Sequence, residues 1–387
     1  MDIASNAQSG NSADFGLYEF QGGITQVLFL RLDGTLASRY FHFNEGLLDS
    51  YGHAAFDLIG VVDCTVSGNA GGSGDWSFDG AANHLVLLGN SFDNGGGGSH
   101  VVRILAGYKI VMSNNDVAGV GALGTHMLKQ HAKEWAVAGA FNPGGVGTYT
   151  EHLVISNNSF DQDTAGANTN KQPIGLGVQD ATVDERTRYV IFEGNWVKNA
   201  LQGAQILMVW CSNITIRNNL IDATTNTGTG PELITVENRG SHPDPDKVWL
   251  YNNTVFSSRS MTEVFPIVMY AGTNIVARNN IAWCDAATSA DMLFGTITAS
   301  ANSSDAQVNG TSPNFASATP SVAADFQLAS NSYGVTAGAE SVPVFDDFFW
   351  NVRNLGNMDI GFHAYTTGSL PESGGSTPLG SMLGGLG

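Results

Sequence analysis

One short pattern recurs along the chain: alternating apolar residues, a polar residue, Asn-Asn or Gly-Asn, and an apolar residue two positions later. Residues 110–117 (IVMSNNDV) and 153–160 (LVISNNSF) are two of its copies. The second asparagine of the copies lies at positions 69, 90, 115, 158, 195, 219, 253 and 280, and the copy ending at Asn69 is the weakest. Consecutive positions are separated by 21 residues (69 to 90) to 43 residues (115 to 158). Such a period predicts a solenoid of stacked coils.

The alternation within each copy is typical of a strand with one buried side. Asparagine tolerates the left-handed backbone conformation, so it can turn the chain between two strands. A second apolar strand lies between the copies, for example at residues 100–105 (HVVRIL) and 205–209 (QILMV). Stacked coils would place asparagine above asparagine, where the side-chain amides can hydrogen-bond along the stack. A β-sandwich with a repeated hairpin turn is the alternative, but no returning strand of fixed register follows Asn-Asn.

These rungs resemble the right-handed parallel β-helix proteins, the superfamily of pectate lyases, polygalacturonases, alginate lyases and phage tailspikes. The resemblance covers roughly residues 55–285 and implies an all-β fold, a right-handed single-stranded parallel β-helix. The phrases SPNF (312–315), DFQL (325–328) and DIGF (359–362) are similar to the segment that covers the last coil in many bacterial β-helix proteins. Fold motifs of this kind do not define one activity.

The chain is therefore expected to divide into four parts. They are N-terminal coils or a cap (1–54), the β-helix repeats (55–285), a closing coil with a C-terminal cap segment (286–366), and a Gly- and Ser-rich tail (367–387).

Composition excludes several functions. The net charge is −19 with only 16 Lys plus Arg, which argues against nucleic acid and against anionic membranes as partners. Cys64, Cys211 and Cys284 are too few for a disulfide framework and are expected to be buried thiols. No signal peptide and no membrane-spanning apolar run are visible. The expected location is extracellular, on a cell surface or on a virion.

The chemically richest strand is residues 125–131 (THMLKQH). We expect Lys129 and His131 to share its outer side, with Arg103 projecting from the equivalent strand of the preceding coil. A polysaccharide lyase needs a base for the proton alpha to a uronate carboxylate and a positive group for the developing charge. In the lyases that this chain resembles, the base is often Lys or Arg. The resemblance thus implies Lys129 as the base, Arg103 as the carboxylate neutraliser, and His131 or His126 as the proton donor.

The longest inserts, residues 133–149 and 161–171, are expected to flank the site, because insertions in a solenoid tend to lie on one face. The candidate substrate-binding residues are Trp135, Tyr149, Gln179, Glu237 and Arg239. Gln179 is expected one coil after Lys129 in a ladder of outward side chains that Glu237 and Arg239 extend. The aromatic rings are expected to stack on sugars.

Carboxylates support a rival mechanism. Asp180, Asp184 and Glu185, or Asp161 with Asp163, are candidates for the acid and base of a glycoside hydrolase. The first three residues are also candidate ligands for calcium, which is the only candidate cofactor.

Two functions remain in view. The first is an enzyme that binds and degrades a uronate-containing polysaccharide, with a lyase favoured over a hydrolase. The alternative is a non-catalytic tailspike, adhesin or structural carbohydrate-binding protein, which would be a homotrimer if it is a virion spike.

Overall fold

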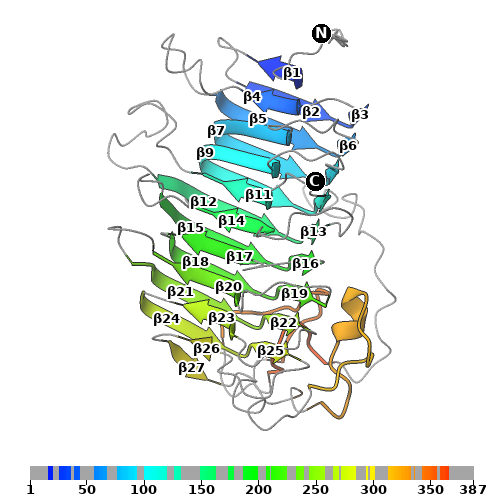
Figure 1. Cartoon of the computed structure of the whole chain (residues 1–387), viewed down its shortest axis with the longest axis vertical. Coiled ribbons are helices and arrows are strands. Elements are labelled where there is room, and N and C mark those ends of the chain that lie inside the picture. The colour runs from blue at the N-terminus through cyan, green and yellow to red at the C-terminus, as the bar shows by residue number, and fades with distance from the viewer. Residues whose placement is uncertain are drawn as a thin grey trace, which may run out of the picture.

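The computed structural model describes residues 16–20, 26–35, 39–43, 56–67, 76–93, 100–119, 126–131, 149–162, 173–177, 186–198, 206–209, 211–224, 232–238, 244–257, 265–269, 272–284, 293–294, 297–300, 313–332, 335, 342–354 and 358–365. This part of the chain is a right-handed parallel β-helix, as predicted (Figure 1). Its strands form an 18-stranded and a 9-stranded sheet. Successive coils pair in parallel, for example β12 with β15 and β15 with β18, which contradicts the β-sandwich alternative.

The 18-stranded sheet has two parts, because only β7 (Trp76–Leu88) and β9 (His100–Ser113) run through both. Sheet 1 contains the first halves of these strands with β1 (Gly16–Phe20), β4 (Arg39–Phe43), β11 (His126–Gln130), β14 (Ile174–Leu176), β17 (Ile206–Val209), β20 (Glu232–Glu237), β23 (Phe265–Met269) and β26 (Leu293–Phe294). Sheet 2 contains their second halves with β2 (Gln26–Leu30), β5 (Phe56–Val62), β12 (Tyr149–Ser156), β15 (Arg186–Glu193), β18 (Cys211–Arg217), β21 (Asp246–Tyr251), β24 (Thr273–Arg278) and β27 (Thr298–Ser300).

Sheet 3 is the 9-stranded sheet. Its strands are β3 (Asp33–Thr35), β6 (Thr65–Ser67), β8 (Ser91–Asp93), β10 (Asp116–Ala118), β13 (Ser159–Asp161), β16 (Trp196–Lys198), β19 (Leu220–Ala223), β22 (Thr254–Ser257) and β25 (Ile281–Cys284). A coil passes through sheet 1, sheet 2 and sheet 3 in that order. Among the described residues, no helix has the length and apolar character to span a membrane.

The interior of the coils is apolar and stacked in register. Phe160 pairs with Val197, which pairs with Ile221, and all three side chains are fully buried. Cys64 and Cys211 are buried free thiols, as predicted, whereas the side chain of Cys284 lies outside the described residues.

The corner between sheets 2 and 3 begins with a residue in the left-handed conformation. Its φ lies between 52° and 65° at Arg31, Asp63, Gly89, Asn114, Asn157, Gly194, Asn218, Asn252 and Asn279. Asparagine and glycine adopt this conformation at the lowest cost, which explains why the sequence pattern reads Asn-Asn or Gly-Asn.

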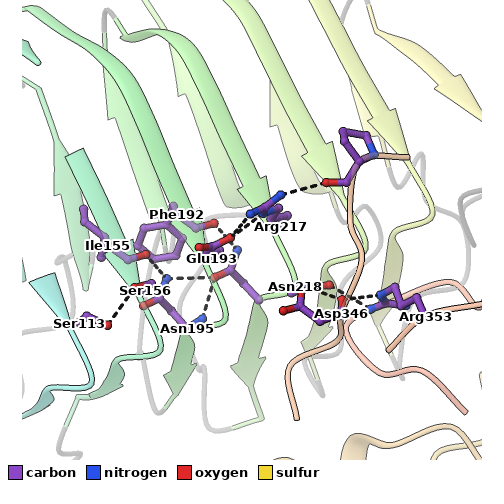
Figure 2. Close-up of polar contacts among 12 residues, drawn as sticks. Ser113, Ile155, Ser156, Phe192, Glu193, Asn195, Arg217, Asn218, Asp346 and Arg353 are labelled. Carbon is purple, nitrogen blue, oxygen red and sulfur yellow. Dashed lines mark hydrogen bonds and ion pairs between the residues drawn. The ribbon is translucent and has the colours of Figure 1, made fainter. Parts of the chain in front are cut away.

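The second corner residue forms a ladder of side-chain amides, as predicted. Asn219 Nδ2 donates to Asn253 Oδ1 and to the carbonyl of Phe192, both at 2.9 Å, and the Asn219 backbone N–H donates to the same Oδ1 at 3.1 Å. The Asn219 Oδ1 accepts from the backbone and side chain of Asn195 at 2.9 and 3.1 Å (Figure 2 shows the equivalent contacts of Asn195). The ladder contains Asn90, Asn115, Asn158, Asn195, Asn219, Asn253 and Asn280, all buried.

The weakest sequence copy was placed wrongly, because Cys64 and not Asn69 occupies the ladder position of its coil. The pairing of Thr65 with Ser91 aligns Cys64 with Asn90. The Cys64 N–H donates to Asn90 Oδ1 at 2.9 Å, and its Sγ accepts from the Leu32 N–H at 3.4 Å. Burial raises the pKa of the Cys64 thiol, so a neutral thiol continues the ladder. Asn69 lies outside the described residues.

The described residues of the closing segment, 313–332, 335, 342–354 and 358–365, pack on the outer side of the last coils. On sheet 3, Phe326 and Phe362 pack in one cluster with Phe256 and Trp283. Figure 1 shows this segment in orange and red beside β19, β22 and β25. The DIGF phrase contacts the corner directly, since the Gly361 N–H donates to the carbonyl of Asn279 at 2.7 Å.

Arg353 connects the closing segment to the corner (Figure 2). It is 3% exposed, and its guanidinium donates to the carbonyls of Asp346 (2.8 Å), Asp359 (3.3 Å) and Gly361 (2.8 Å) and to Asn218 Oδ1 (3.0 Å). Burial lowers the pKa of Arg353 to about 10, so the group stays cationic at neutral pH. These four oxygen acceptors replace the hydrogen bonds to water that the guanidinium loses on burial.

We predict that Asn219→Leu lowers the free energy of unfolding by about 1–3 kcal/mol, because the Phe192 carbonyl and the Asn195 amide lose buried partners. Asn114→Gly is the control. Gly89 and Gly194 occupy equivalent left-handed positions, so this change should alter stability by less than about 0.5 kcal/mol. Urea unfolding of both variants measures the difference, and equal midpoints would argue against a structural role for the ladder.

A second prediction concerns acid. The Leu328 N–H donates to His363 Nδ1 at 3.2 Å, and burial lowers the pKa of His363 to about 4, against the opposing effect of Asp347. As the pH falls, His363 is therefore protonated in the unfolded chain before it is protonated in the folded protein. Its contribution to stability, about 3 kcal/mol, is complete above about pH 6.5 and is lost as the pH falls toward 4. His363→Asn keeps an acceptor but cannot titrate. Thermal melting of both proteins across this range should show a smaller loss for the variant, and parallel curves would contradict the assignment.

Candidate functional site

Charged side chains of three successive coils meet on sheet 1. Lys129 on β11 pairs in register with Arg103 on β9, which pairs with Asp79 on β7. The predicted adjacency of Arg103 and Lys129 is therefore confirmed. Arg103 Nη1 lies 3.8 Å from Asp79 Oδ1, and these side chains are 15% and 2% exposed. Sequence reasoning missed Asp79, although one further coil of the same register would have identified it.

Lys129 does not project into solvent, contrary to the prediction. It is 3% exposed, and its Nζ donates to the carbonyl of Gly177 on the next coil at 2.5 Å. Met127 belongs to the main apolar core, as does Leu128. The N–H groups of Met127 and Leu128 both donate to the carbonyl of Pro173, which interrupts the regular alternation at the start of β11. His131 is partly exposed.

Three histidines lie next to this pair. The rings of His100 and His126 are 5.1 Å apart with their Nδ1 atoms at 3.3 Å, and the rings of His100 and His131 are 6.3 Å apart. Burial holds the pKa of His100 well below its usual value, and electrostatic interaction with His126, His131, Arg103 and Lys129 lowers it further. His100 is thus neutral at neutral pH. No role was predicted for His100 from the sequence, although its pairing with His126 follows from the same register.

An aromatic ring and a glycine complete the surroundings. The Arg103 guanidinium lies over the Trp76 ring, 4.9 Å from its centroid, in a cation–π contact. Gly175 pairs with Lys129, and a Cβ at this glycine would lie 2.8 Å from His126 ring atoms and 3.4 Å from Lys129 Cδ. The absence of a side chain at residue 175 thus makes room for both neighbours.

Gln130 fixes the end of β11 from inside. It is fully buried, and its Oε1 accepts from Thr187 Oγ1 at 2.7 Å and from the Gly177 N–H at 3.1 Å. The carbonyl of Gly177 also accepts a hydrogen bond from the Lys129 ammonium. Gln130 therefore positions the residue that binds this lysine. Sequence reasoning missed this contact, since a polar residue at an inward position carries no sign of its partner.

The register corrects the predicted ladder beyond Lys129. The next member is Gly175 and not Gln179, and the column then continues to Thr235 through β17. Glu237 lies on the same strand as Thr235 but two positions further along. The error arose because the insert before β14 has no fixed length, so counting residues from the preceding coil gives the wrong register.

Several candidate residues lie outside the described part of the chain, and their roles remain predictions. They are Trp135, Gln179, Asp180, Asp184, Glu185, Arg239 and, from the hydrolase alternative, Asp163. For Tyr149 the structure gives only the backbone, which pairs with residue 186. Asp161 lies on sheet 3, where its Oδ2 is 3.0 Å from Lys198 Nζ. Within the described ranges, no group of three or more His, Cys, Asp or Glu is arranged to hold a metal ion.

This cluster, Asp79, His100, Arg103, His126, Lys129 and His131, can bind an anion and exchange protons. Arg103 suits a carboxylate because a guanidinium presents paired donors. The partly exposed His131 suits proton transfer, because an imidazole can both donate and accept a proton. No family model matches the chain, and no curated protein matches its sequence. The functional argument therefore rests on the fold and on this geometry.

We predict that Gly175→Ala lowers the free energy of unfolding by about 1–3 kcal/mol, because the new methyl group overlaps the His126 ring. Adding His126→Ala removes that ring, so the double variant should lose less than the sum of the two single changes. A double-mutant cycle from urea unfolding measures this coupling. Strict additivity would show that residue 175 does not control the position of His126.

Proposed function

We propose that the protein binds a uronate-containing polysaccharide on the outer side of sheet 1 and cleaves it by β-elimination. The observation that carries the proposal is the pairing of Arg103 with Lys129 on adjacent coils, beside three histidines. The chain has only 16 Lys plus Arg against 35 Asp plus Glu, so a basic cluster is a local exception to an acidic protein. An acidic polymer would be repelled elsewhere and attracted here.

In this proposal each residue has one step. Arg103 pairs with the uronate carboxylate and stabilises the charge that develops on it. Lys129, as the neutral amine, takes the proton alpha to that carboxylate and becomes an ammonium, the freed electron pair forms the carbon–carbon double bond, and the glycosidic carbon–oxygen bond beta to the carboxylate breaks. His131 gives a proton to the departing oxygen. The products are an unsaturated sugar end and a new free hydroxyl group. The resemblance of the rungs to pectate lyase-like proteins supports this reaction class, and the proposal places the protein outside the cell, on a cell surface or on a virion.

A second candidate function is favoured by one observation. Lys129 is buried and bound to the Gly177 carbonyl, an arrangement equally typical of a structural cation. A non-catalytic saccharide-binding protein, such as a tailspike or adhesin, would need Arg103 and the histidines but no free lysine base.

The test is incubation with a panel of uronate polymers while the ultraviolet absorbance of unsaturated ends is recorded. We expect turnover by the wild-type protein and a loss of at least ~10²-fold for Lys129→Ala. Arg103→Gln should mainly raise KM. Lys109→Ala changes an exposed lysine on sheet 2 and should leave turnover unchanged. Because Lys129 is buried, its removal should also lower stability, so rates are compared well below each melting temperature.

Full activity of Lys129→Ala on a verified substrate would exclude this lysine as the base. Polymer binding that depends on Arg103, without new absorbance on any polymer of the panel, would support the non-catalytic candidate.

A further inference from the structure

Two histidines of adjacent coils share a hydrogen bond within the cluster on sheet 1. His100 is the first residue of β9 and His126 the first residue of β11, and they pair in register. Their Nδ1 atoms lie 3.3 Å apart, and their ring centroids are 5.1 Å apart at an angle of 50°. We call these two residues the histidine pair. A hydrogen bond between two Nδ1 atoms contains one hydrogen, so one ring donates and the other is unprotonated at this nitrogen.

This hydrogen bond determines how many protons the histidine pair can hold. A proton added to the donor ring goes to its Nε2 and leaves the hydrogen bond in place, now with a charged donor. A second added proton would put a hydrogen on both Nδ1 atoms, which would then repel each other across 3.3 Å. The histidine pair therefore titrates as a unit, and it accepts the first added proton more readily than the second.

Neighbouring groups of the cluster oppose even the first proton. Arg103 on β9 and Lys129 on β11 pair in register beside the histidine pair, and the ring of His131 lies 6.3 Å from that of His100. Burial lowers the pKa of His100 most, and the interactions with these neighbours lower it further. The carboxylate of the cluster, Asp79 on β7, lies 3.8 Å from Arg103, where it offsets the guanidinium rather than the histidine pair.

A bound anion would remove this opposition. The proposed function places a uronate carboxylate at Arg103, where its negative charge would offset the cations that face the histidine pair. On the next coil, β14 adds no charge at this point, because Gly175 faces the His126 ring. Binding of the anion and binding of the proton are then linked, and each favours the other by the same factor.

We propose that the histidine pair takes up one proton from solvent when a uronate binds at Arg103, so that acidity controls substrate binding at this site. The inference rests on the proposed function and adds its regulation. The proton stays on the histidine pair while the carboxylate is bound and returns to solvent on release. It is then one ring contact away from His131, the group that protonates the departing oxygen in the proposed reaction.

The direction of the pH dependence follows from this linkage. The bound anion raises the proton affinity of the histidine pair, so uronate affinity is lost as the pH rises through the range in which the complex gives up the proton. At the acidic end, affinity becomes constant once the free protein is also protonated. Because the pKa of His100 is well below its usual value in the free protein, binding takes up a proton over the range between these two limits.

Calorimetry of the full chain with free uronates tests the proposal. A free uronate has the carboxylate but no glycosidic bond to break, so binding is measured without turnover. Titrations at one pH in buffers with different heats of ionisation give the number of protons taken up. We expect about 0.3–1 proton per site near about pH 6, almost none at about pH 8.5, and an affinity that rises by up to ~10-fold per pH unit between them. Galactose, which has no carboxylate, is the control and should cause no proton uptake.

Two variants separate the histidine pair from other histidines. His126→Phe keeps a buried ring without nitrogens and should reduce proton uptake at least ~2-fold. His84→Gln is the matched control, because His84 lies on sheet 2, where its Nδ1 is 3.4 Å from Asp57, and uptake should be unchanged. Histidine NMR of the wild-type protein covers a failure of His126→Phe to fold. The two rings should gain one proton jointly, at a higher pH with uronate than without.

The outcomes distinguish the coupling from the proposed function. Uronate binding without proton uptake overturns the coupling and leaves the proposed function intact, as does uptake that persists in a folded His126→Phe protein. Independent titration of the two rings in the NMR measurement also overturns it. Binding of no uronate of the panel overturns the proposed function, and the coupling with it.

Discussion

The amide ladder at the corner between sheets 2 and 3 is the interaction on which the rest of the molecule depends. Each ladder asparagine from Asn115 to Asn253 accepts two hydrogen bonds from the preceding coil's asparagine and donates to the following one, so adjacent coils cannot slip by one residue. A slip would exchange the inner and outer sides of every strand. The residue before it supplies the left-handed turn that directs the chain into sheet 3. Coils of very different length can therefore stack, because the register is restored at each corner.

The different roles of the two corner residues explain which features could be predicted from the sequence. The Asn-Asn pattern records both corner requirements, and so the fold, the stacking and the ladder were all predictable. The pairing of Arg103 with Lys129 followed because their strands lie just after short inserts. The residue that follows Lys129 in this column was predicted wrongly as Gln179, because inserts carry no periodicity. The structure places Gly175 at that position. Cys64 was missed because a thiol replaces the amide, and only the three-dimensional register shows that equivalence.

The burial of Lys129 could not be predicted from the sequence for a different reason. Alternation predicts which side of a strand a residue faces, but not whether that side meets water. Here the ammonium binds a backbone carbonyl of the next coil, and Arg353 binds three backbone carbonyls within the closing segment. In this acidic chain these two buried cations serve as internal hydrogen-bond donors, so the segment that carries their acceptors must be in place before the cation is satisfied.

The contacts of the closing segment also bear on how the chain is synthesised. Each coil contacts its neighbours in sequence, so the β-helix can grow coil by coil as the chain leaves the ribosome. The bonds from Arg217 to Pro343 and from Arg353 to Asn218 span 126 and 135 residues, and they form only after nearly the whole chain has been made. Until then Trp249 and Tyr251 lack the cover that Val342, Val344 and Met358 provide. The nascent protein thus passes through an interval in which the side chains of Trp249 and Tyr251 are open to chaperones, or to the same surface of a neighbouring nascent chain.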